Sequence, residues 1–271
     1  MTSRVLVVGA SGPLGPEVVR ELRQFGHEVT GASRSGALNT EKLDVADLDA
    51  ASNTLHRLRP NAVVYLVRPD LPDSTNSHGP IEASTVSLRA FAEMCADVGV
   101  RRFIFASSAA VYGDQANHPV GEEIQPTPKS PYADLKLRSE RVLEIFDSEE
   151  NFAVCSLRVF NIYGPRFSNS LINRLTLRLK PAIYDTESFV RDYIHVSDVA
   201  RGFRLAVEDR SPIPGILNLG TGQGTSNRSL IALYPDAPFE RLPASGIYSY
   251  SVADVTRIRD HLGFEAATLL A

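Results

Sequence analysis

The sequence is poor in several features that would each point to a particular class of protein. It has only two cysteines in 271 residues, Cys95 and Cys155. Their spacing matches neither a metal site nor a disulfide framework. No apolar run reaches the ~18 residues that indicate a membrane-spanning helix. The first residues lead into a strand pattern without the charged start and cleavage site of a secretion signal. We therefore expect buried thiols, no metal, no membrane contact and a cytoplasmic protein.

The sequence also lacks an excess of positive charge. Its 28 Lys and Arg residues are outnumbered by 32 Asp and Glu residues, which gives a formal net charge of −4. Proteins that bind nucleic acid usually carry a basic surface, so we expect no nucleic-acid partner. A hydrophobic content of 43% and a charged content of 22% are ordinary for a globular protein.

A buried strand followed by a glycine-rich turn opens the chain. The apolar run of residues 4–8 is typical of a parallel strand covered on both faces. Gly9, Gly12 and Gly15 follow it at the spacing G-x-x-G-x-x-G, before a helical pattern. Such glycines let the backbone approach a pyrophosphate, which the free N–H groups of the helix start then face. The pattern predicts a dinucleotide site; a tight turn without a ligand is the alternative.

The residues after the second strand pattern bear on which dinucleotide binds. Residues 28–32 lead to Ser33 and Arg34, where NAD-binding folds usually carry Asp or Glu for the ribose hydroxyls. A hydroxyl and a guanidinium favour the 2′-phosphate of NADP instead. We predict NADP(H) as the favoured cofactor and NAD(H) as the second choice, with a solvated Arg34 as the alternative to a phosphate clamp. Asp44 is a candidate for the adenine amino group.

A tyrosine and a lysine four residues apart follow a pair of serines. Ser107 and Ser108 end an apolar run, and Tyr132 and Lys136 lie on one face of a helical pattern. A free phenol has a pKa near ~10, and an adjacent ammonium lowers it toward the range that suits proton transfer at neutral pH. With Ser108 holding a carbonyl or carbinol oxygen, these residues form a candidate catalytic set. The alternative is that Tyr132 packs on the sheet and Lys136 is solvated.

Strand and helix patterns alternate along most of the chain. This order predicts an α/β fold with a doubly wound parallel sheet, of the Rossmann type. Residues 68–80, with three prolines, predict a loop over the cofactor side of the sheet. Besides residues 4–8 and 28–32, strands are expected at 62–67, 103–107 and 152–157, and helices at 81–98 and 132–146.

These motifs together resemble the extended short-chain dehydrogenase/reductase family, in its branch of nucleotide-sugar epimerases, dehydratases and ketoreductases. The resemblance covers residues 4 to about 265 and includes the later motifs around residues 158–165, 191–200 and 218–222. It implies that Ser108 donates to the substrate oxygen and that Tyr132 is the acid/base. It also implies that Lys136 binds the ribose and lowers the tyrosine pKa.

The resemblance implies two sets of binding residues and no metal ligand. The substrate set is Ser108, Ala109, Tyr132, Asn161 and Arg191, of which Asn161 and Arg191 would meet the diphosphate of a nucleotide sugar. The cofactor set is Gly9, Ser11, Gly12, Leu14, Gly15, Ser33, Arg34, Asp44, Val45, Leu66, Val67, Ala106, Tyr132, Lys136 and Val159.

The resemblance also implies how the chain is divided and how it assembles. Residues 1–160, joined again by 192–219, would form the dinucleotide lobe. Residues 161–191 and 220–271 would form a small C-terminal substrate-binding lobe. Members of the family commonly pair through the helix that bears the tyrosine and the long helix before it, so we expect a homodimer.

The chain departs from the family pattern at places that bear on the reaction. Tyr65-Leu66-Val67-Arg68 stands where the family often has His-Leu-Ala-Ala, near the expected nicotinamide. Ala109 and Ala110 replace the Asp-Glu pair of the sugar dehydratases, which argues against loss of water. An arginine that helps to hold the nucleotide diphosphate is absent around residues 244–247.

Reduction and epimerisation remain as reactions. The leading hypothesis is NADPH-dependent reduction of a keto group, expected to be a 4-keto group, on a nucleotide-linked sugar, because a net reductase exchanges NADPH and Ser33-Arg34 favours NADP. The first alternative is an NAD(P)-dependent 4-epimerase of a nucleotide sugar. The others are a ketoreductase of a natural-product carbonyl without a nucleotide and a non-catalytic cofactor-binding sensor.

Overall fold

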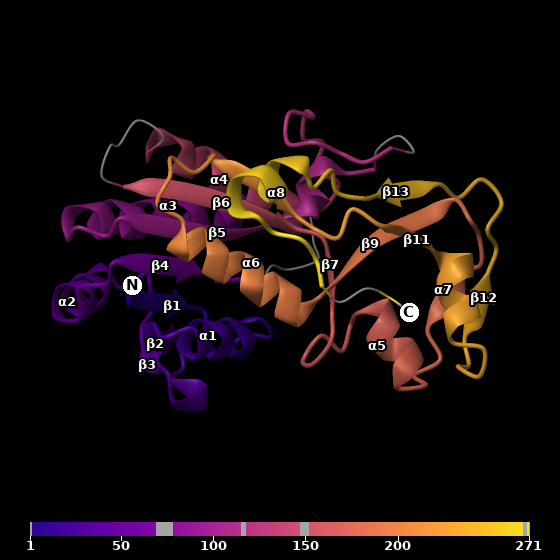
Figure 1. Ribbon diagram of the computed structural model, residues 1–271, viewed down its shortest axis with the longest axis horizontal. Coiled ribbons are helices and arrows are strands. Elements are labelled where there is room, and N and C mark those ends of the chain that lie inside the picture. The colour runs from indigo at the N-terminus through magenta and orange to yellow at the C-terminus, as the bar shows by residue number, and fades with distance from the viewer. Residues whose placement is uncertain (1, 69–77, 115–117, 147–151, 268–269, 271) are drawn as a thin grey trace.

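A parallel sheet of seven strands forms the centre of the protein (Figure 1). The computed structural model describes residues 2–68, 78–114, 118–146, 152–267 and 270. The strand order is β10-β6-β5-β4-β1-β2-β3, so the order reverses beside β1 and leaves a crevice at the carboxyl ends of β1 and β4. The strands are β1 (Arg4–Val8), β2 (Glu28–Ser33), β3 (Glu41–Lys42), β4 (Ala62–Tyr65), β5 (Arg102–Ser108), β6 (Ala153–Val159) and β10 (Ile216–Leu219).

Helices cover both faces of this sheet because successive strand residues point to opposite sides. Val5 and Val7 of β1 lie in one hydrophobic cluster, and Leu6 and Val8 lie in another. In Figure 1, α1 and α6 lie together on one side of the sheet, and α3 and α4 lie on the other. The covering helices are α1 (Gly15–Gln24), α6 (Val196–Glu208) and α8 (Thr256–Leu262) on the first face, and α2 (Leu48–Leu58), α3 (His78–Asp97) and α4 (Pro131–Leu143) on the second. The predicted doubly wound α/β fold is confirmed.

A smaller group of strands and helices lies beyond the carboxyl ends of the large sheet, at the right of Figure 1. Asp192 is fully buried there and accepts hydrogen bonds from the amides of Thr221 (2.9 Å), Gly222 (2.9 Å) and Ala253 (3.2 Å). One carboxylate thus ties together three segments that are distant in the sequence. The elements are β7 (Asn161–Tyr163), β9 (Phe189–His195), β11 (Gly224–Ser226) and β13 (Ser249–Ser251) in one sheet, β8 (Ala182–Tyr184) with β12 (Glu240–Leu242), α5 (Leu171–Thr176) and α7 (Asn227–Leu233).

The division into lobes at the predicted residues stays a prediction. One segment of the predicted smaller lobe, the region of α8, packs on the large sheet, where Ile258 and Phe264 join the core beneath α6. Its apolar side chains have more surface to bury there than among the short strands of the smaller lobe. In the part of the chain that the structure describes, no helix is long and apolar enough to cross a membrane.

Several element ends differ from the sequence prediction. Strand β4 ends at Tyr65 rather than at Val67, and α3 begins at His78, inside the predicted loop. Residues 69–77 of that loop lie outside the described residues. The cap of α6 is His195, whose Nδ1 accepts from the Ser197 amide at 3.3 Å. Asp198, on the first turn of the same helix, pairs with Arg201 at 2.8 Å. Cys95 and Cys155 are buried free thiols, as predicted.

Candidate active site

The glycine turn at the end of β1 leaves room for a ligand where side chains would close it. Gly9 has φ +85°, and a Cβ on it would lie 2.9 Å from the backbone of Leu66. A Cβ on Gly15 would lie 2.3 Å from the carbonyl oxygen of Ala10, so only glycine lets α1 begin so close to the strand. The N-cap residue of α1, Leu14, gives no side-chain hydrogen bond to the helix start. In the first turn of α1, Gly15 and Val18 donate to Gly12 and Leu14, and Pro16 has no N–H, so the amide of Glu17 is the one left for a pyrophosphate. The open glycine turn and this amide fit the predicted dinucleotide.

The residues expected at the adenosine end lie along the ends of β2 and β3. The Ser33 side chain is buried and its hydroxyl shares a hydrogen bond with Thr40 Oγ1 at 2.6 Å. Arg34 is exposed and makes no hydrogen bond or ion pair with any residue that the structure describes. Asp44 accepts from the Ala46 amide at 3.0 Å and is exposed. Their contacts with a cofactor stay predictions.

The residues expected near the nicotinamide follow the neighbouring strands of the large sheet. Leu66 and Val67 follow β4, Ala106 lies in β5, and Val159 ends β6. Because the strands are parallel, these positions meet at one edge of the sheet, together with the glycine turn. The cofactor set predicted from distant parts of the sequence is therefore brought to one side of the molecule.

The three predicted catalytic residues come together at this edge. The hydroxyl of Ser130 caps α4 by accepting from the Ala133 amide at 3.2 Å, which places Tyr132 and Lys136 on the first turns of the helix. Ser108, the last residue of β5, lies close enough to the Tyr132 hydroxyl to lower the pKa of that phenol by hydrogen bonding. A serine and a phenol that are so close can both reach one substrate oxygen.

Lys136 is buried beside this pair rather than directed at the tyrosine oxygen. Its side chain is 4% exposed, and Nζ lies 4.7 Å from the centre of the Phe105 ring and 5.9 Å from that of the Tyr132 ring. Nζ also donates to the carbonyl oxygen of Val67 at 3.4 Å. Burial and, to a smaller extent, the charge of Arg68 lower the pKa of Lys136 to about 7, although the charge of Glu140 acts to raise it.

The electrostatics of Tyr132 differ from the sequence prediction. Burial raises the pKa of Tyr132, while the hydrogen bond from Ser108 and the charge of Arg68 lower it. We expected the neighbouring Lys136 to lower this pKa. In the folded chain Arg68 is the neighbouring cation that does so, because the buried ammonium of Lys136 is itself poorly stabilised. The Arg68 guanidinium carbon lies 5.1 Å from the centre of the Tyr132 ring.

A buried ion pair behind the catalytic residues was missed at the sequence level. Arg158 donates to both carboxylate oxygens of Glu140, at 3.0 and 2.7 Å, and Ser107 donates to the same carboxylate. Glu140 and Arg158 are each 2% exposed. Two signals were available. Glu140 stands four residues after Lys136 on the same helix face, and Arg158 is a charge within an apolar strand pattern.

The residues expected to bind the substrate diphosphate are held inside the smaller group of strands. Asn161 donates to the Asp192 carbonyl oxygen at 3.3 Å. Arg191 donates to the Val190 carbonyl oxygen at 2.8 Å and to Ser249 Oγ at 2.6 Å, and it lies over the Phe189 ring. Ala109, beside Ser108, is 5% exposed. Of these residues, only Ala109 adjoins a residue of the catalytic set in the chain, and the contacts of all three with a substrate stay predictions.

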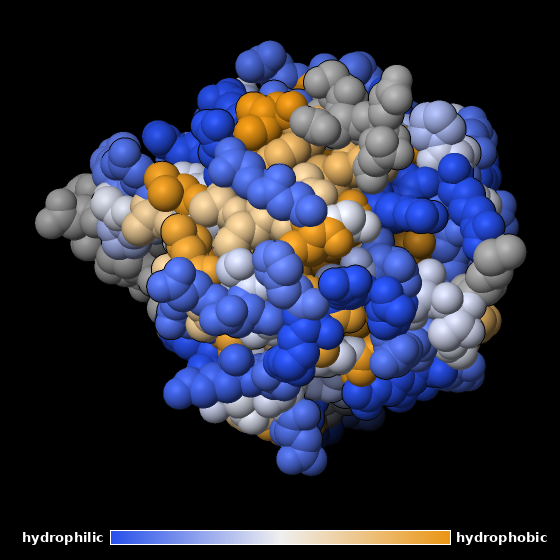
Figure 2. Space-filling view, turned by 90° about the vertical axis from the view of Figure 1, so that its left-hand side faces the viewer, coloured by the Kyte–Doolittle hydropathy of each residue, from blue (hydrophilic) through white to orange (hydrophobic). Residues whose placement is uncertain are grey.

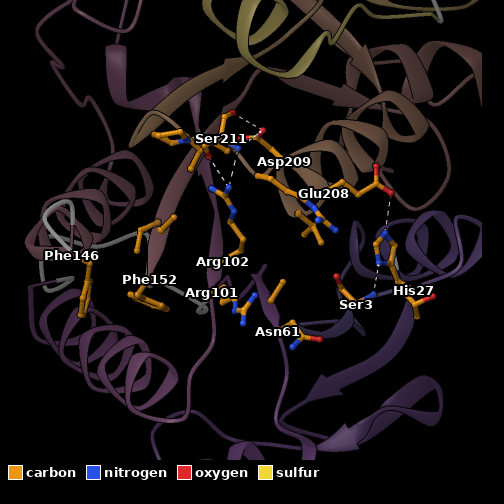
Figure 3. A pocket seen from close by; sticks show the side chains of 18 of the residues that line it. Ser3, His27, Asn61, Arg101, Arg102, Phe146, Phe152, Glu208, Asp209 and Ser211 are labelled. Atoms are coloured by element: carbon orange, nitrogen blue, oxygen red, sulfur yellow. Dashed lines mark hydrogen bonds and ion pairs between the residues drawn. The ribbon is translucent and has the colours of Figure 1, made fainter. Parts of the chain in front are cut away.

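A separate hollow of about 990 Å³ lies at the opposite end of the sheet (Figure 3). Residues just before or at the start of the strands line it, among them Ser3, Asn61 and Arg102. Figure 2 looks onto this end of the molecule, where hydrophobic residues gather near the middle among hydrophilic ones. None of the predicted site residues lines the hollow. Ligands of doubly wound sheets bind at the carboxyl ends of the strands, so we place the active site there despite the size of this hollow.

The glycine turn, the Ser108–Tyr132 contact and the buried Lys136 at one sheet edge define a nicotinamide-dependent enzyme with a doubly wound fold. A family comparison agrees: the chain belongs to the NAD dependent epimerase/dehydratase family, whose sequence model matches residues 5–220. The expected membership in the extended short-chain dehydrogenase/reductase family is confirmed. No group of three or more His, Cys, Asp or Glu side chains could hold a metal ion among the described residues.

Individual relatives are similar over nearly the whole chain. UDP-glucose 4-epimerase of Mycolicibacterium smegmatis is 29% identical over 305 aligned residues, covering 99% of this chain and 95% of the relative. MoeE5 has been solved in complex with UDP-glucose and NAD; it is 30% identical with a TM-score of 0.84, covering 98% of this chain and 94% of MoeE5. A UDP-glucose 4-epimerase of Stenotrophomonas maltophila with bound NAD is 26% identical with a TM-score of 0.85, at the same coverage of 98% and 94%.

Proposed function

We propose that this protein is an NAD-dependent 4-epimerase of a nucleotide sugar. The observation that carries the proposal is the meeting of Ser108, Tyr132 and the buried Lys136 at the carboxyl edge of the sheet, in a chain similar along its length to 4-epimerases. Reduction by NADPH, the leading hypothesis from the sequence, has less support because the similar solved proteins hold NAD. No observation in the structure favours a natural-product carbonyl or a sensor.

The side chains support a reversible oxidation of one sugar hydroxyl. Bound NAD would supply a hydride acceptor and donor for the sugar carbon. Ser108 would hydrogen-bond the 4-hydroxyl oxygen, and Tyr132 would take its proton as the C4–H bond gives up its electron pair. Once the ring presents the other face of C4, Tyr132 would return the proton to the same oxygen, which leaves that carbon inverted. The cofactor ends as it began, so no second reductant is needed.

The proposal of NAD rests on the adenosine end as well. Of the two predicted NADP contacts, the Ser33 hydroxyl already shares a hydrogen bond with Thr40. Arg34 makes no hydrogen bond or ion pair with a described residue, so it alone is left to bind a 2′-phosphate. A single exposed guanidinium gives a weaker preference for a 2′-phosphate than a converging set of donors. The relatives with bound NAD therefore weigh more than the Ser33-Arg34 pair.

Product analysis tests the proposed reaction. We expect the purified protein with catalytic NAD to form the 4-epimer of at least one of UDP-glucose, UDP-N-acetylglucosamine and UDP-glucuronate, detected by ion-exchange chromatography. UDP-glucuronate is included because MoeE5 has been solved with UDP-glucuronic acid as well as with UDP-glucose. Tyr132→Phe should lower kcat by roughly 10²- to 10⁴-fold, since the proton acceptor is lost.

A matched tyrosine variant and a cofactor measurement complete the test. Tyr248 is exposed and far along the chain from the catalytic set, so Tyr248→Phe should leave the rate unchanged. Stoichiometric NADPH oxidation with a 4-keto sugar, in place of epimer formation with NAD, would decide for the reductase. NAD should also bind more tightly than NADP by calorimetry.

A further inference from the structure

Two hydroxyl groups at the end of β2 have their protons fixed by the fold. Ser33, the last residue of β2, is 4% exposed, and its Oγ lies 2.6 Å from Thr40 Oγ1. Thr40 Oγ1 also lies 2.7 Å from the carbonyl oxygen of Ala37, which can only accept a hydrogen bond. Because a threonine hydroxyl has one proton, Thr40 donates it to Ala37, and Ser33 has to donate its own proton to Thr40.

The Ser33 hydroxyl is therefore left with lone pairs and no free proton. Its Oγ makes no second hydrogen bond with any residue that the structure describes. A ligand group that reaches this oxygen has to bring a donor of its own. A hydroxyl can do so, whereas a phosphate oxygen, which is an acceptor at neutral pH, meets lone pairs of the same kind. The Ser33–Thr40 pair therefore accepts a hydroxyl and disfavours a phosphate.

The pair lies beside the glycine turn. The amides of Gly9 and Ala10 donate to the Ala32 carbonyl oxygen at 2.9 and 3.0 Å. Ser33 is the next residue, and β2 ends with it. In doubly wound folds, the residue about 20 positions beyond the glycines meets the adenosine ribose at its 2′ position. By this rule Ser33 stands at the end of the cofactor where NAD carries a hydroxyl and NADP a phosphate.

The charges around the pair do not by themselves exclude a phosphate. Arg34 follows Ser33 in the chain, and Lys42 is the register partner of Ser33 on β3. Both cations are exposed, and neither makes a hydrogen bond or ion pair with a described residue. Cations of this kind attract a 2′-phosphate. What the site lacks for NADP is a neutral donor that converges with them, because Thr40 receives the Ser33 proton.

We infer that Thr40 sets the cofactor preference of this protein. By fixing Ser33 as an acceptor, it fits the end of β2 to the 2′-hydroxyl of NAD, which can donate, and against the 2′-phosphate of NADP. The inference rests on the proposed function, in which NAD is the cofactor. Thr40 is a positioning residue, since it acts through Ser33 rather than on the cofactor. Its effect therefore depends on its hydroxyl group and not on its size.

Cofactor binding to the purified protein tests this inference without turnover. Calorimetry gives the dissociation constants of NAD and NADP, and we expect NAD to bind more tightly. Thr40→Val keeps the shape of the side chain but releases the Ser33 proton, which can then bond a phosphate oxygen. A hydrogen bond to a charged group corresponds to roughly 10- to 150-fold in affinity, so NADP should gain by about that factor relative to NAD. Thr40→Ser, which keeps the hydroxyl, should retain the wild-type ratio.

Two further variants show where the effect arises. Ser33→Ala removes the acceptor itself, so it should weaken NAD by roughly 2- to 10-fold, as for a neutral hydrogen bond, and leave NADP unchanged. Thr176→Val is the matched control. Thr176 also donates from its hydroxyl to a carbonyl oxygen, that of Ile172 at 2.9 Å, but it lies on α5 in the smaller group of elements. Its substitution should leave both dissociation constants unchanged.

Three outcomes would overturn the inference. The first is a Thr40→Val protein with the wild-type ratio of the two dissociation constants. The second is an equal loss of affinity for both cofactors in that variant, because Thr40 would then only shape its loop. The third is a wild-type protein that binds NADP more tightly than NAD.

Product analysis separates failure of this inference from failure of the proposed function. If the wild type forms a 4-epimer with NAD and Thr40→Val keeps the cofactor ratio, the epimerase stands and the role of Thr40 falls. If the preference for NAD depends on Thr40 but none of the three UDP-sugars yields a 4-epimer, the role of Thr40 stands and the epimerase falls.

Discussion

At the scale of single residues, the ionisation of each side chain in the site depends on how deeply that side chain is buried. Lys136 and Tyr132 were predicted as a cation and an acidified phenol, but burial acts on both of them against ionisation. Arg68, which remains exposed, lies over the phenol ring. A lysine with a pKa of about 7 can be neutral or charged at physiological pH, so small changes in its surroundings shift its protonation.

The lowered pKa of Lys136 predicts a stability that rises with pH. Below about pH 7 the lysine is protonated in both states, and the folded chain bears the full cost of the buried charge. Between about 7 and the unfolded value of 10.5, only the unfolded chain holds the proton. The free energy of unfolding should then rise by at most about 1.4 kcal/mol per pH unit. Denaturant titrations at pH 6 and pH 9 measure this.

The variant Lys136→Met has no buried charge, so it should lose this pH dependence. Any excess of its free energy of unfolding over that of the wild type at pH 6 should therefore shrink at pH 9. Lys129→Met is the control, since Lys129 is exposed and its removal should leave the pH dependence as in the wild type. Parallel pH curves for the wild type and Lys136→Met would contradict the prediction.

At the scale of elements, one buried ion pair joins the helix of the site to two strands. Glu140 comes from α4, Arg158 from β6 and Ser107 from β5, and together they hold α4 against the ends of the strands. Arg158 also lies over the Tyr112 ring at 4.6 Å. The position of Tyr132 and Lys136 relative to Ser108 depends on this contact, because all three stand on the elements that it joins.

Breaking this pair from one side should be strongly destabilising. Glu140→Gln leaves the Arg158 charge buried without compensation, and we expect a loss of about 3–5 kcal/mol in the free energy of unfolding. Glu93→Gln is the control, because Glu93 pairs with Arg89 on the surface of α3 at 2.9 Å, where a pair contributes at most about 1 kcal/mol. Urea denaturation gives both values, and similar small losses for the two variants would refute the structural role.

At the scale of the whole molecule, α3 and α4 pack side by side on one face of the sheet. The homodimer expected from the family resemblance would pair through these two helices. Leu135, Leu137, Leu143 and Phe146 are buried within the chain, so its own core accounts for them. Val86 of α3 and Ile145 after α4 are the apolar side chains left exposed there, at 62% and 47%.

The homodimer stays a prediction, and these exposed residues make it testable. If two chains pair through α3 and α4, Val86→Asp should shift the protein from dimer to monomer in sedimentation velocity, because a charge would be buried without a partner. Leu233→Asp, on α7, is the control, since Leu233 is also exposed at 42% but lies on another element. A wild-type protein that sediments as a monomer would contradict the pairing.

The alternation of apolar runs and helical patterns was enough to predict the layered fold. A strand buried on both faces must be apolar along its length, so residues 4–8 and 62–65 are recognisable without their neighbours. The glycine turn was recognisable too, because its backbone tolerates no other residue at Gly9 and Gly15. Parallel strand order then implies that the cofactor and catalytic residues meet at one edge.

The sequence by itself thus determined the fold class and the family, and it singled out Ser108, Tyr132 and Lys136 as the candidate catalytic set. Only the tertiary structure decided which cation lies over the phenol, which carboxylate is neutralised, and how far the lysine is buried. These properties depend on distances between residues that are far apart in the chain, such as Arg68 and Tyr132. Charge and hydration at a site follow from that three-dimensional proximity, and local sequence patterns carry no record of it.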